Sequence, residues 1–531
     1  MNDPRFASSL AHGMSVLDAF RDAADGLTNK QLAQRSGLST ASISRLCVTH
    51  VDHGMLRFDA AAGRYWIGPG ALTLAYPFLA RLGLRRVARL PMARLAAALG
   101  GTISLVMRDR TQMVYVETCW ANRPRSFRPD VGAVLPMLQT AAGRAWLASA
   151  EAAERDEVLA QLQAASPTAL RKWRPQVAQA ASDLQKQGFC VSPGHWLPDV
   201  HAVAIPLGID FSGHRMVLNC GVPAARAQEG RLLGKIGPEL RQLAAQIEQE
   251  WRSAPQATEP GVVARGPSRH VQPPPSRVRC APDSAQTLGR GLDVLACFTP
   301  DQPVLGNAAL ARQAGVSPQT MVRLTYTLVQ LGLLQRSRHA AGYSLAVGCV
   351  ALAYPMLANL RMRTLARPGM MALSKQLGGA VSLGLQHRLG MVYVETAWRT
   401  DGRYLPPDTG AVMPMLATAM GRAWLAQAAA SERQALLNQI DVLDPAMAAR
   451  FGAEVPKALK QYDKHGYCSS RDFRPDIEAI AVAFSRPCGG VRFVMNCGIH
   501  APKPLSAAQR TGIGSALMEL VAGLEEKCIG L

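Results

Sequence analysis

The stretch that decides the fold is Asn307–Leu331, NAALARQAGVSPQTMVRLTYTLVQL. Gly315 suits a helix C-terminus, and Ser317 is a preferred helix N-cap. Pro318 then stands at the first helical position, where its missing N–H costs nothing. Apolar side chains recur after it at spacings of three and four, at Met321, Leu324, Leu328 and Leu331. The pattern predicts two short helices joined by a tight turn.

A basic ribbon follows this pair of helices. Two short extended pieces, Leu334–Arg338 and Gly342–Leu345, complete a predicted winged helix-turn-helix. The same order of elements occurs once more, near the start of the chain. There the predicted helices are Thr28–Ser36 and Thr40–His53, and the predicted ribbon is Leu56–Ile67.

The repetition extends well beyond this motif. Gly132–Ala148 (GAVLPMLQTAAGRAWLA) and Gly410–Ala426 (GAVMPMLATAMGRAWLA) agree at 14 of 17 positions, with an offset of 278 residues. The same offset relates Tyr115–Thr118 to Tyr393–Thr396, both YVET. Such a period is far longer than that of a solenoid, so the ordered matches indicate duplication of a whole unit.

The duplication predicts an α+β chain of five segments. Two winged helix-turn-helix domains occupy residues 1–75 and 284–353, and residues 253–283 form a Pro-rich linker. Residues 76–252 and 354–531 each hold a linking helix, near Leu72–Leu99 and Val350–Leu377, and an α+β sensor domain. In the first sensor domain, alternating patterns predict strands within Gly101–Thr118, Ala202–Ile209 and Met216–Cys220, and helices at Thr140–Ala148 and Pro175–Gln187.

Composition narrows the classes of partner. The formal net charge is +20, which favours polyanions, nucleic acid first. The eleven cysteines include no CxxC pair, which argues against a zinc ribbon or a disulfide framework and favours reduced thiols in the cytoplasm. We expect no signal peptide and no membrane span, because no long apolar run occurs. We also expect no cofactor.

The second helix of each motif is the expected DNA reader, because such helices enter the major groove with their N-terminal residues. Arginine can bind guanine and glutamine can bind adenine, while hydroxyl groups suit phosphate or base edges. The predicted contacts in the helices are Thr40, Ala41, Ser42, Ser44, Arg45, Gln319, Thr320, Val322 and Arg323. The predicted contacts in the ribbons are Arg57, Arg64, Arg336 and Arg338. A helix pair with Gly-x-Ser between is common in helical proteins, but two such pairs with basic ribbons favour DNA binding.

Both copies resemble the IclR family of bacterial transcriptional regulators nearly end to end. The resemblance rests on LTNKQLAQRSGLSTASISRL, GRYWIGPGAL and LPMLQTAAGRAWLA in the first copy, and on LGNAALARQAGVSPQTMVRLTYTLVQLGLL, GYSLAVG and MPMLATAMGRAWLA in the second. It implies an N-terminal winged helix and a C-terminal domain that binds a small effector, often an aromatic or short organic acid. It also implies pairing through the DNA-binding domains, so we expect a homodimer of the fused chain associated with the nucleoid.

Several positions of the sensor domains depart from the family pattern. Leu138 and Leu416 stand where a polar residue, often histidine, is common, and Arg144 and Arg422 replace the usual lysine. A cysteine position of the family is Ala202 in the first copy, and a proline position is Ala483 in the second.

Basic and polar side chains of the sensor domain are the predicted effector anchors. They are Arg123, Arg125, Arg128, Ser104 and Asp199 in copy 1, and Arg399, Arg403, Ser382 and Asp476 in copy 2. A solvated basic loop is the alternative interpretation of the arginines. His195, His201 and His214 have no histidine in register in copy 2, so we predict no metal site. No catalytic arrangement occurs that would make an enzyme the leading hypothesis.

The two heads differ in ways that predict unlike behaviour. From Leu38–Leu56 to Val316–Leu334 only 7 of 19 positions agree, so we expect an operator of two different half-sites. His50 replaces Leu328 on the packing stripe, which predicts that head 1 is less stable or binds DNA more weakly. Two alternatives remain: a DNA-binding regulator whose effector pockets no longer function, and a small-molecule enzyme or sensor without DNA binding.

Overall fold

The computed structural model describes residues 3–23, 25–121, 128–211, 213–227, 232–253, 285–338, 340–398 and 407–528. The predicted linker, apart from Ser253, and four of the predicted effector arginines, Arg123, Arg125, Arg399 and Arg403, lie outside these residues. Among the described residues, no helix is long and apolar enough to cross a lipid bilayer.

Each copy begins with a winged helix-turn-helix head, as predicted. Head 1 contains α1 (Ser8–Asp18), α2 (Asn29–Ser36), α3 (Thr40–Asp52), β1 (Leu56–Asp59) and β2 (Arg64–Ile67). Head 2 contains α11 (Gln286–Ala296), α12 (Asn307–Ala314), α13 (Pro318–Gln330), β9 (Leu334–Arg336) and β10 (Tyr343–Leu345). Helices α1 and α11 are additions to the sequence prediction, which assigned no helix before α2 or α12.

The two heads pack against each other within the one chain through α1 and α11. Gly13 of α1 lies against Leu288, and Gly291 of α11 lies against Leu10, a reciprocal pair of contacts. At the start of each of these two helices, a backbone N–H also donates a hydrogen bond to a side chain of the opposite head. The backbone N–H of Ala7 donates to Thr327 Oγ1 of α13, and that of Ala285 donates to Thr49 Oγ1 of α3, both at 2.8 Å. The fused chain is therefore an internal dimer with approximate twofold symmetry.

Two helices, not the single one expected, link each head to its sensor domain. They are α4 (Pro69–Arg81) and α5 (Gly83–Leu99) in copy 1, and α14 (Gly348–Asn359) and α15 (Arg361–Leu377) in copy 2. The break lies at Leu82 and Leu360, whose backbone leaves the helical region. Helices α4 and α14 pack against each other between the heads and the sensor domains.

Each sensor domain is a six-stranded antiparallel sheet between two layers of helices. In copy 1 the strand order is β5-β4-β3-β8-β7-β6, with α5 and α10 on one face and α6 on the other. The strands and helices are β3 (Thr102–Asp109), β4 (Gln112–Trp120), β5 (Val134–Pro136), α6 (Ala141–Ser149), α7 (Ala152–Ala165), α8 (Pro167–Gln187), β6 (Cys190–Pro193), β7 (Val200–Phe211), β8 (His214–Pro223), α9 (Ala224–Ala227) and α10 (Leu232–Ser253).

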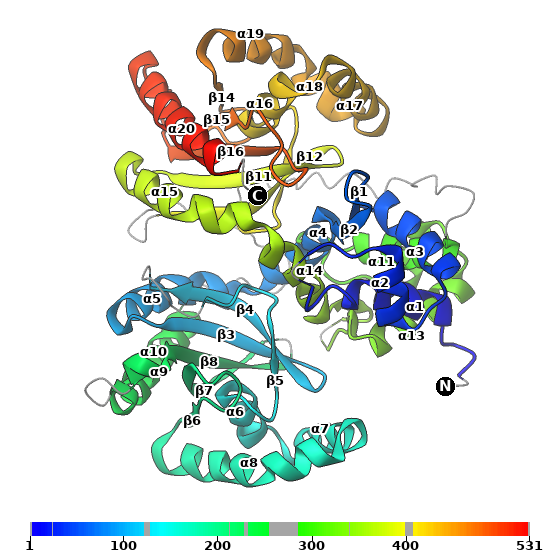
Figure 1. Cartoon of the computed structure of the whole chain (residues 1–531), viewed down its shortest axis with the longest axis vertical. Helices are drawn as coiled ribbons and strands as arrows, with labels where there is room; N and C mark the ends of the chain where they lie inside the picture. Colours follow the sequence, from blue (N-terminus) through cyan, green and yellow to red (C-terminus); the bar gives the residue numbers. More distant parts are fainter. Residues whose placement is uncertain are drawn as a thin grey trace.

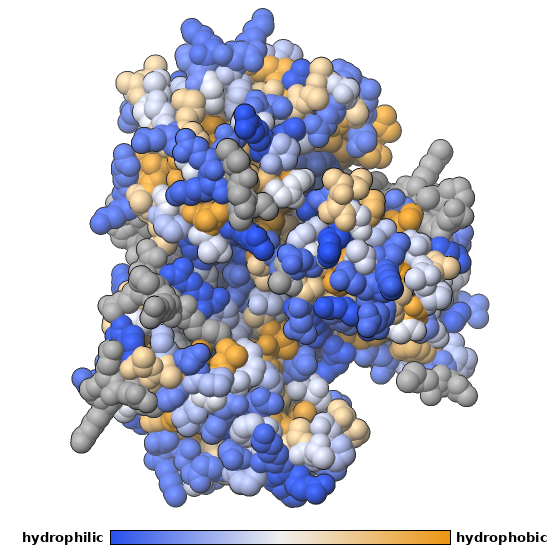
Figure 2. Space-filling view, viewed as in Figure 1, coloured by the Kyte–Doolittle hydropathy of each residue, from blue (hydrophilic) through white to orange (hydrophobic). Residues whose placement is uncertain are grey.

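Copy 2 repeats this arrangement in the order β13-β12-β11-β16-β15-β14. Its elements are β11 (Ala380–His387), β12 (Gly390–Ala397), β13 (Val412–Pro414), α16 (Ala419–Gln427), α17 (Ala430–Leu443), α18 (Pro445–Phe451), η2 (Gly452–Glu454), α19 (Val455–His465), β14 (Cys468–Ser470), β15 (Ile477–Ala483), β16 (Phe493–His500) and α20 (Ala507–Cys528). Figure 1 shows the two sensor domains above and below, with the paired heads to one side of both. The face seen in Figure 2 is mostly hydrophilic, with scattered apolar patches.

One pair of cysteines corrects the expectation of reduced thiols. Cys488, in the loop between β15 and β16, forms a disulfide with Cys528 at the end of α20. The two residues are 40 positions apart in the sequence. Only the packed fold brings them together, so the cysteine spacing could not predict this disulfide. The other cysteines that the structure describes are free, and all but Cys119 are buried.

Candidate DNA interface and the contacts between the copies

Recognition helix α3 begins where the sequence places it. Gly37 adopts a left-handed conformation, with φ of 71°, after α2, and the Ser39 hydroxyl accepts a hydrogen bond from Ser42 N at the start of α3. Four predicted contacts, Thr40, Ala41, Ser42 and Arg45, are exposed. Ser44 is half-buried, because its hydroxyl donates to Thr40 O and accepts from Asn29 Nδ2.

Recognition helix α13 has the same start but a different surface. Ser317 caps it by accepting from Thr320 N, after Gly315 with φ of 64°. Gln319, Val322 and Arg323 are exposed, and the Val322 side chain keeps 46% of its area accessible. An exposed valine suits contact with a thymine methyl group, whereas head 1 has Ser44 at the matching position.

The predicted ribbon arginines divide into two groups. Arg57 donates from Nη2 to Gly489 O of sensor domain 2 at 3.0 Å, and Arg64 donates from Nη1 to Gly26 O within its own head. Arg338 lies against Gly213 of sensor domain 1. Arg336 is exposed on β9. In this arrangement three of the four contact protein backbone, and Arg57 connects a wing to the sensor domain of the other copy.

Each sensor domain touches the head of the opposite copy through the tip of its first hairpin. His387, the last residue of β11, and Arg388, which follows it, contact Gly54 and the carbonyl oxygen of His53 in head 1. The matching tip, Asp109 and Arg110, contacts Gly332 in head 2. The joints are therefore crossed between the copies. They differ chemically, because the first has a histidine, His387, at the tip where the second has Asp109.

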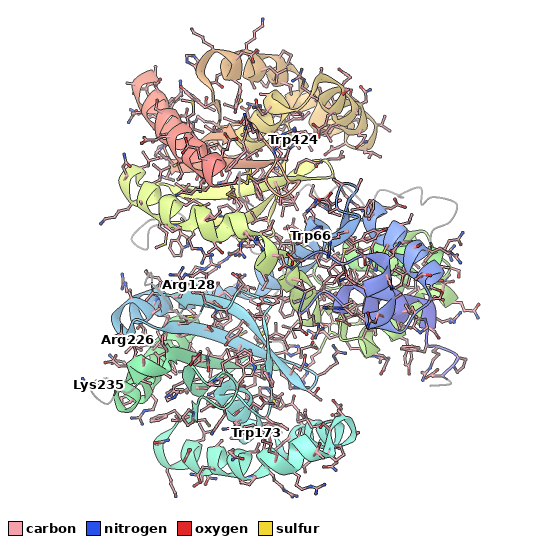
Figure 3. All side chains as sticks on the ribbon, in the orientation of Figure 1. Trp66, Arg128, Trp173, Arg226, Lys235 and Trp424 are labelled. Atoms are coloured by element: carbon pink, nitrogen blue, oxygen red, sulfur yellow. A yellow bond between two sulfur atoms is a disulfide. The ribbon has the colours of Figure 1, made fainter. Side chains whose placement is uncertain are left out.

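The predicted effector anchors that the structure describes do not form one site. Ser104 and Ser382 are buried in their sheets, whereas Asp199 is exposed and Asp476 pairs with Arg474 at 2.7 Å. Arg128 lies on the side of sensor domain 1 that faces sensor domain 2 (Figure 3). The arrangement thus offers no support for a shared pocket of these five residues.

The space between sheet and α6 in sensor domain 1 is small. A cavity of about 20 Å³ remains beside Tyr115, Thr140 and Asn219. Arg144 is buried nearby, donates from Nε to Leu138 O at 2.8 Å and lies over the ring of Trp173. In copy 2, Arg422 makes the same contact with Leu416 O and pairs with Asp472. The residues that depart from the family pattern thus fill this face of the domain.

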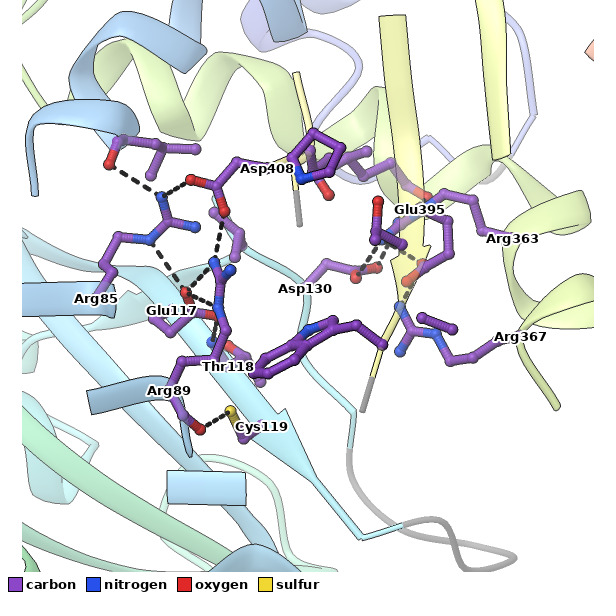
Figure 4. Close-up of a pocket in the computed structure, with 18 of the residues that line it drawn as sticks. Arg85, Arg89, Glu117, Thr118, Cys119, Asp130, Arg363, Arg367, Glu395 and Asp408 are labelled. Carbon is purple, nitrogen blue, oxygen red and sulfur yellow. Dashed lines mark hydrogen bonds and ion pairs between the residues drawn. The ribbon is translucent and has the colours of Figure 1, made fainter. Parts of the chain in front are cut away.

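A larger cavity lies between the two copies, and a network of charged residues forms one side of it (Figure 4). Glu117 Oε2, on β4, pairs with Arg85 Nε at 3.2 Å and with Arg89 Nη2 at 2.7 Å, both on α5. Asp408 of copy 2 completes the network, 2.6 Å from Arg89 Nη2 and 3.4 Å from Arg85 Nη1. A carboxylate of one copy is therefore held by two arginines of the other.

The other side of the cavity repeats this network with the copies exchanged. Arg363 of α15 binds Asp130 of copy 1 through both Nη atoms, each at 3.1 Å, and pairs with Glu395 Oε2, also at 3.1 Å. Arg367 pairs with Glu395 and stacks on Trp120 of copy 1, with Cζ 3.9 Å from the ring centre. All four charged positions match those of the first network at the offset of 278.

The two networks differ in how fully their arginines are neutralised. Burial by itself lowers the pKa of Arg89, but Glu117 and Asp408 outweigh it and hold that pKa above its ordinary value. Burial raises the pKa of Asp408, but Arg85 and Arg89 outweigh it and lower the value to about 2. Burial leaves the pKa of Arg367 below its usual range, because Glu395 is its one close carboxylate partner among the described residues. Arg367 is thus the less neutralised cation.

Sequence reasoning did not single out these charged residues, although a signal was present. Arg85, Arg89, Asp130 and their counterparts are identical in both copies, in a stretch where exposed positions have diverged. Glu117 and Glu395 lie in the two matching YVET stretches, and their ion pairs give this match a structural reason. Of the three histidines of sensor domain 1, His195 contacts Arg144 and His214 contacts Gln335 of head 2. Across the part of the chain that the structure describes, no cluster suited to a metal ion occurs.

Two family models match the chain, each of them twice. The IclR helix-turn-helix domain matches residues 9–60 and 287–338. The C-terminal domain of bacterial IclR transcriptional regulators matches residues 77–249 and 355–486. Together they cover most of the chain and both halves of the duplication.

Individual relatives are similar to one copy at a time. The HTH-type transcriptional regulator TsaQ1/TsaQ2 of Comamonas testosteroni is 30% identical over 251 residues, which are 46% of this chain and 89% of the relative. The Pca regulon regulatory protein of Pseudomonas putida is 25% identical over 241 residues, 45% of this chain and 82% of the relative. Among solved structures, an IclR family transcriptional regulator from Brucella abortus is 33% identical, with a TM-score of 0.42, covering 46% of this chain and 94% of its own.

Proposed function

We propose, from the premise that this chain belongs to the IclR family of bacterial transcriptional regulators, that it reads one operator made of two unlike half-sites. The observation that carries the proposal is the internal pair of heads, each with an exposed and different recognition surface. Head 1 presents hydroxyl groups and Arg45, and head 2 presents Gln319, Val322 and Arg323. A single chain thus supplies both readers that a two-part operator needs.

The crossed joints support a small-molecule effector as the control of DNA binding. Each sensor domain contacts the head of the other copy, so a change in the spacing of the sensor domains acts on both heads. An effector acts in this way only if it binds one arrangement of the copies more tightly than another. A homodimer of the fused chain would bring four heads together, and it remains a prediction.

A regulator without a working effector pocket is the second candidate. The observation that favours it is the filled face of each sensor domain, where Arg144 and Arg422 occupy the space beside α6 and α16. Under this alternative, small organic acids do not change the affinity for DNA. The affinity then depends only on a partner or on the concentration of the chain.

The test is selection of binding sites from random DNA at near-physiological salt. Wild-type protein is compared with the Arg45→Ala/Arg323→Ala double variant, whose changes lie on exposed positions. We expect wild type to select one motif and the variant to lose it, because each guanine-binding arginine contributes about 1–3 kcal/mol of discrimination. Fixed salt is essential, since phosphate contacts alone let a chain of charge +20 bind any DNA at low salt. Equal, sequence-blind binding by both proteins would reject the proposal.

A further inference from the structure

The cavity beside Arg89 and Arg367, between the two copies, has the size and the mixed apolar and charged lining that a small molecule needs. Its volume is about 250 Å³, against about 20 Å³ beside α6 in sensor domain 1. An apolar cavity of about 150 Å³ is known to hold one benzene molecule. The inter-copy cavity therefore has room for a single substituted ring, and the space in the sensor domain has not.

The lining of this cavity is apolar in its middle and charged at two sides. Leu72 and Leu79 of α4 face it together with Val350 and Leu357 of α14, so both linking helices contribute. Trp120 and Trp398, at the ends of matching strands, also line it. Flat aromatic faces and branched aliphatic side chains favour a planar apolar ring over a flexible polar molecule.

The two charged sides of the cavity differ in how many carboxylates their arginines already contact. Arg89 already contacts two carboxylates, Glu117 and Asp408. Among the described residues Arg367 contacts one carboxylate, that of Glu395, which is also held by Arg363 at 3.1 Å. A guanidinium group carries five N–H donors and binds carboxylates through two of them at once. Arg367 is therefore the member of the cavity wall with most capacity for an additional anion.

We propose that this cavity binds one single-ring aromatic carboxylate per fused chain, with the ring against the linking helices and the carboxylate at Arg367. The inference rests on the proposed function, since it names the site and chemistry of the effector. It replaces the expectation of one pocket in each sensor domain. The site exists only between the two copies, so its occupation directly sets their spacing, and hence the contacts of the hairpin tips with the heads.

The experiment is titration calorimetry of the full chain with benzoate and its 3- and 4-hydroxy and methyl derivatives. Benzamide serves as the uncharged counterpart of benzoate. We expect one site per chain for at least one of the acids, and no heat with benzamide. Arg367→Met should abolish binding, while Glu395 keeps its partner Arg363.

Two further variants locate the site. Ala93, a partly exposed residue of the cavity wall, has Met371 as its counterpart in copy 2. Ala93→Met therefore installs a side chain that the fold already accepts, and the filled space should weaken binding about tenfold. Ala202→Leu is the matched control, because Ala202 lines the small space in sensor domain 1. It should leave the affinity unchanged.

Three outcomes would overturn the inference: no binding by any of these acids, two sites per chain, or loss of binding in Ala202→Leu and not in Ala93→Met. Thermal melting of each variant shows that the chain is folded before titration. Binding of ligand-free protein to the selected operator is measured in parallel. If DNA binding persists while the acids fail to bind, the effector site is rejected and the DNA-binding proposal stands; if DNA binding fails, the proposed function itself is rejected.

Discussion

His50 shows how one side chain makes the two heads unequal. It is buried in head 1, where Nε2 lies 2.8 Å from Gly13 O and Nδ1 has no hydrogen-bond partner. Leu328 fills the matching position in head 2. Burial lowers the pKa of His50 to about 4, from an ordinary value of 6.5. The partnered nitrogen explains why the imidazole is tolerated in an apolar core.

This pKa predicts an acid-sensitive head 1. Between pH 6.5 and pH 4 the unfolded chain binds a proton at His50 that the folded chain does not, so stability is full above pH 6.5 and falls as pH decreases to 4. The loss is about 1.4 kcal/mol per pH unit across that window. His50→Leu should flatten this part of the profile, as measured by thermal melting from pH 4 to 7. An unchanged slope would show that His50 is not the titrating group.

Asp408 is the residue on which the connection between the copies most depends. It pairs with Arg85 and Arg89 of the other copy, and its pKa of about 2 keeps it charged at all but extreme acid pH. Asp408→Asn should cost about 3–5 kcal/mol of unfolding free energy, because it leaves two buried arginines with one carboxylate. Denaturant unfolding measures the loss. Asp476→Asn, which affects a half-exposed local pair, is the control and should cost less than about 1 kcal/mol.

At the scale of elements, local sequence rules predicted the recognition helices well. The start of α13 at Pro318 and the end of α12 at Ala314 follow from a capping serine, a proline and a left-handed glycine, which act within a few residues. The break at Leu82 was not predictable in this way. There Arg85 Nη1 donates to Leu79 O at 3.0 Å, so the arginine that reaches the other copy also satisfies a carbonyl group freed at the break.

Local sequence patterns predict the exposed positions of the recognition helices but do not predict the cavity between the copies. Exposed positions on α3 and α13 follow from helical periodicity. The inter-copy cavity depends on contacts between residues more than 200 positions apart, such as Arg89 with Asp408 and Arg363 with Asp130, which no local pattern contains. The position of α1 and α11 was missed for a related reason, since their apolar sides face the other copy.

Helices α1 and α11 give a prediction about the pairing of the heads. A Cβ added at Gly13 would lie 2.5 Å from Leu288 Cδ1, so a small side chain forces Leu288 to shift and a large one has no room. Gly13→Leu should separate the heads and lower affinity for the two-part operator more than for an isolated half-site, as measured by fluorescence anisotropy. Gly523→Ala, in a helix where nothing lies within 4 Å of the added carbon, is the control. Equal losses for the operator and the half-site would contradict an intramolecular pair.

At the scale of the whole molecule, fusion converts a symmetric pair into one with two distinct halves. Reciprocal contacts preserve the symmetry where the copies meet, as in Gly13 with Leu288 and Gly291 with Leu10. The recognition surfaces have diverged, and so have the hairpin tips, where His387 occupies the position that matches Asp109. Because one gene product carries both halves, each can diverge without the other, and the operator need not be a palindrome.

The most direct test of this account is binding-site selection repeated with two single variants, Arg45→Ala and Arg323→Ala. Each variant changes one exposed arginine on one recognition helix. The account predicts that wild type selects an asymmetric motif, that Arg45→Ala loses sequence preference in one half-site, and that Arg323→Ala loses it in the other. A perfect inverted repeat, degraded at the same positions by both variants, would contradict it.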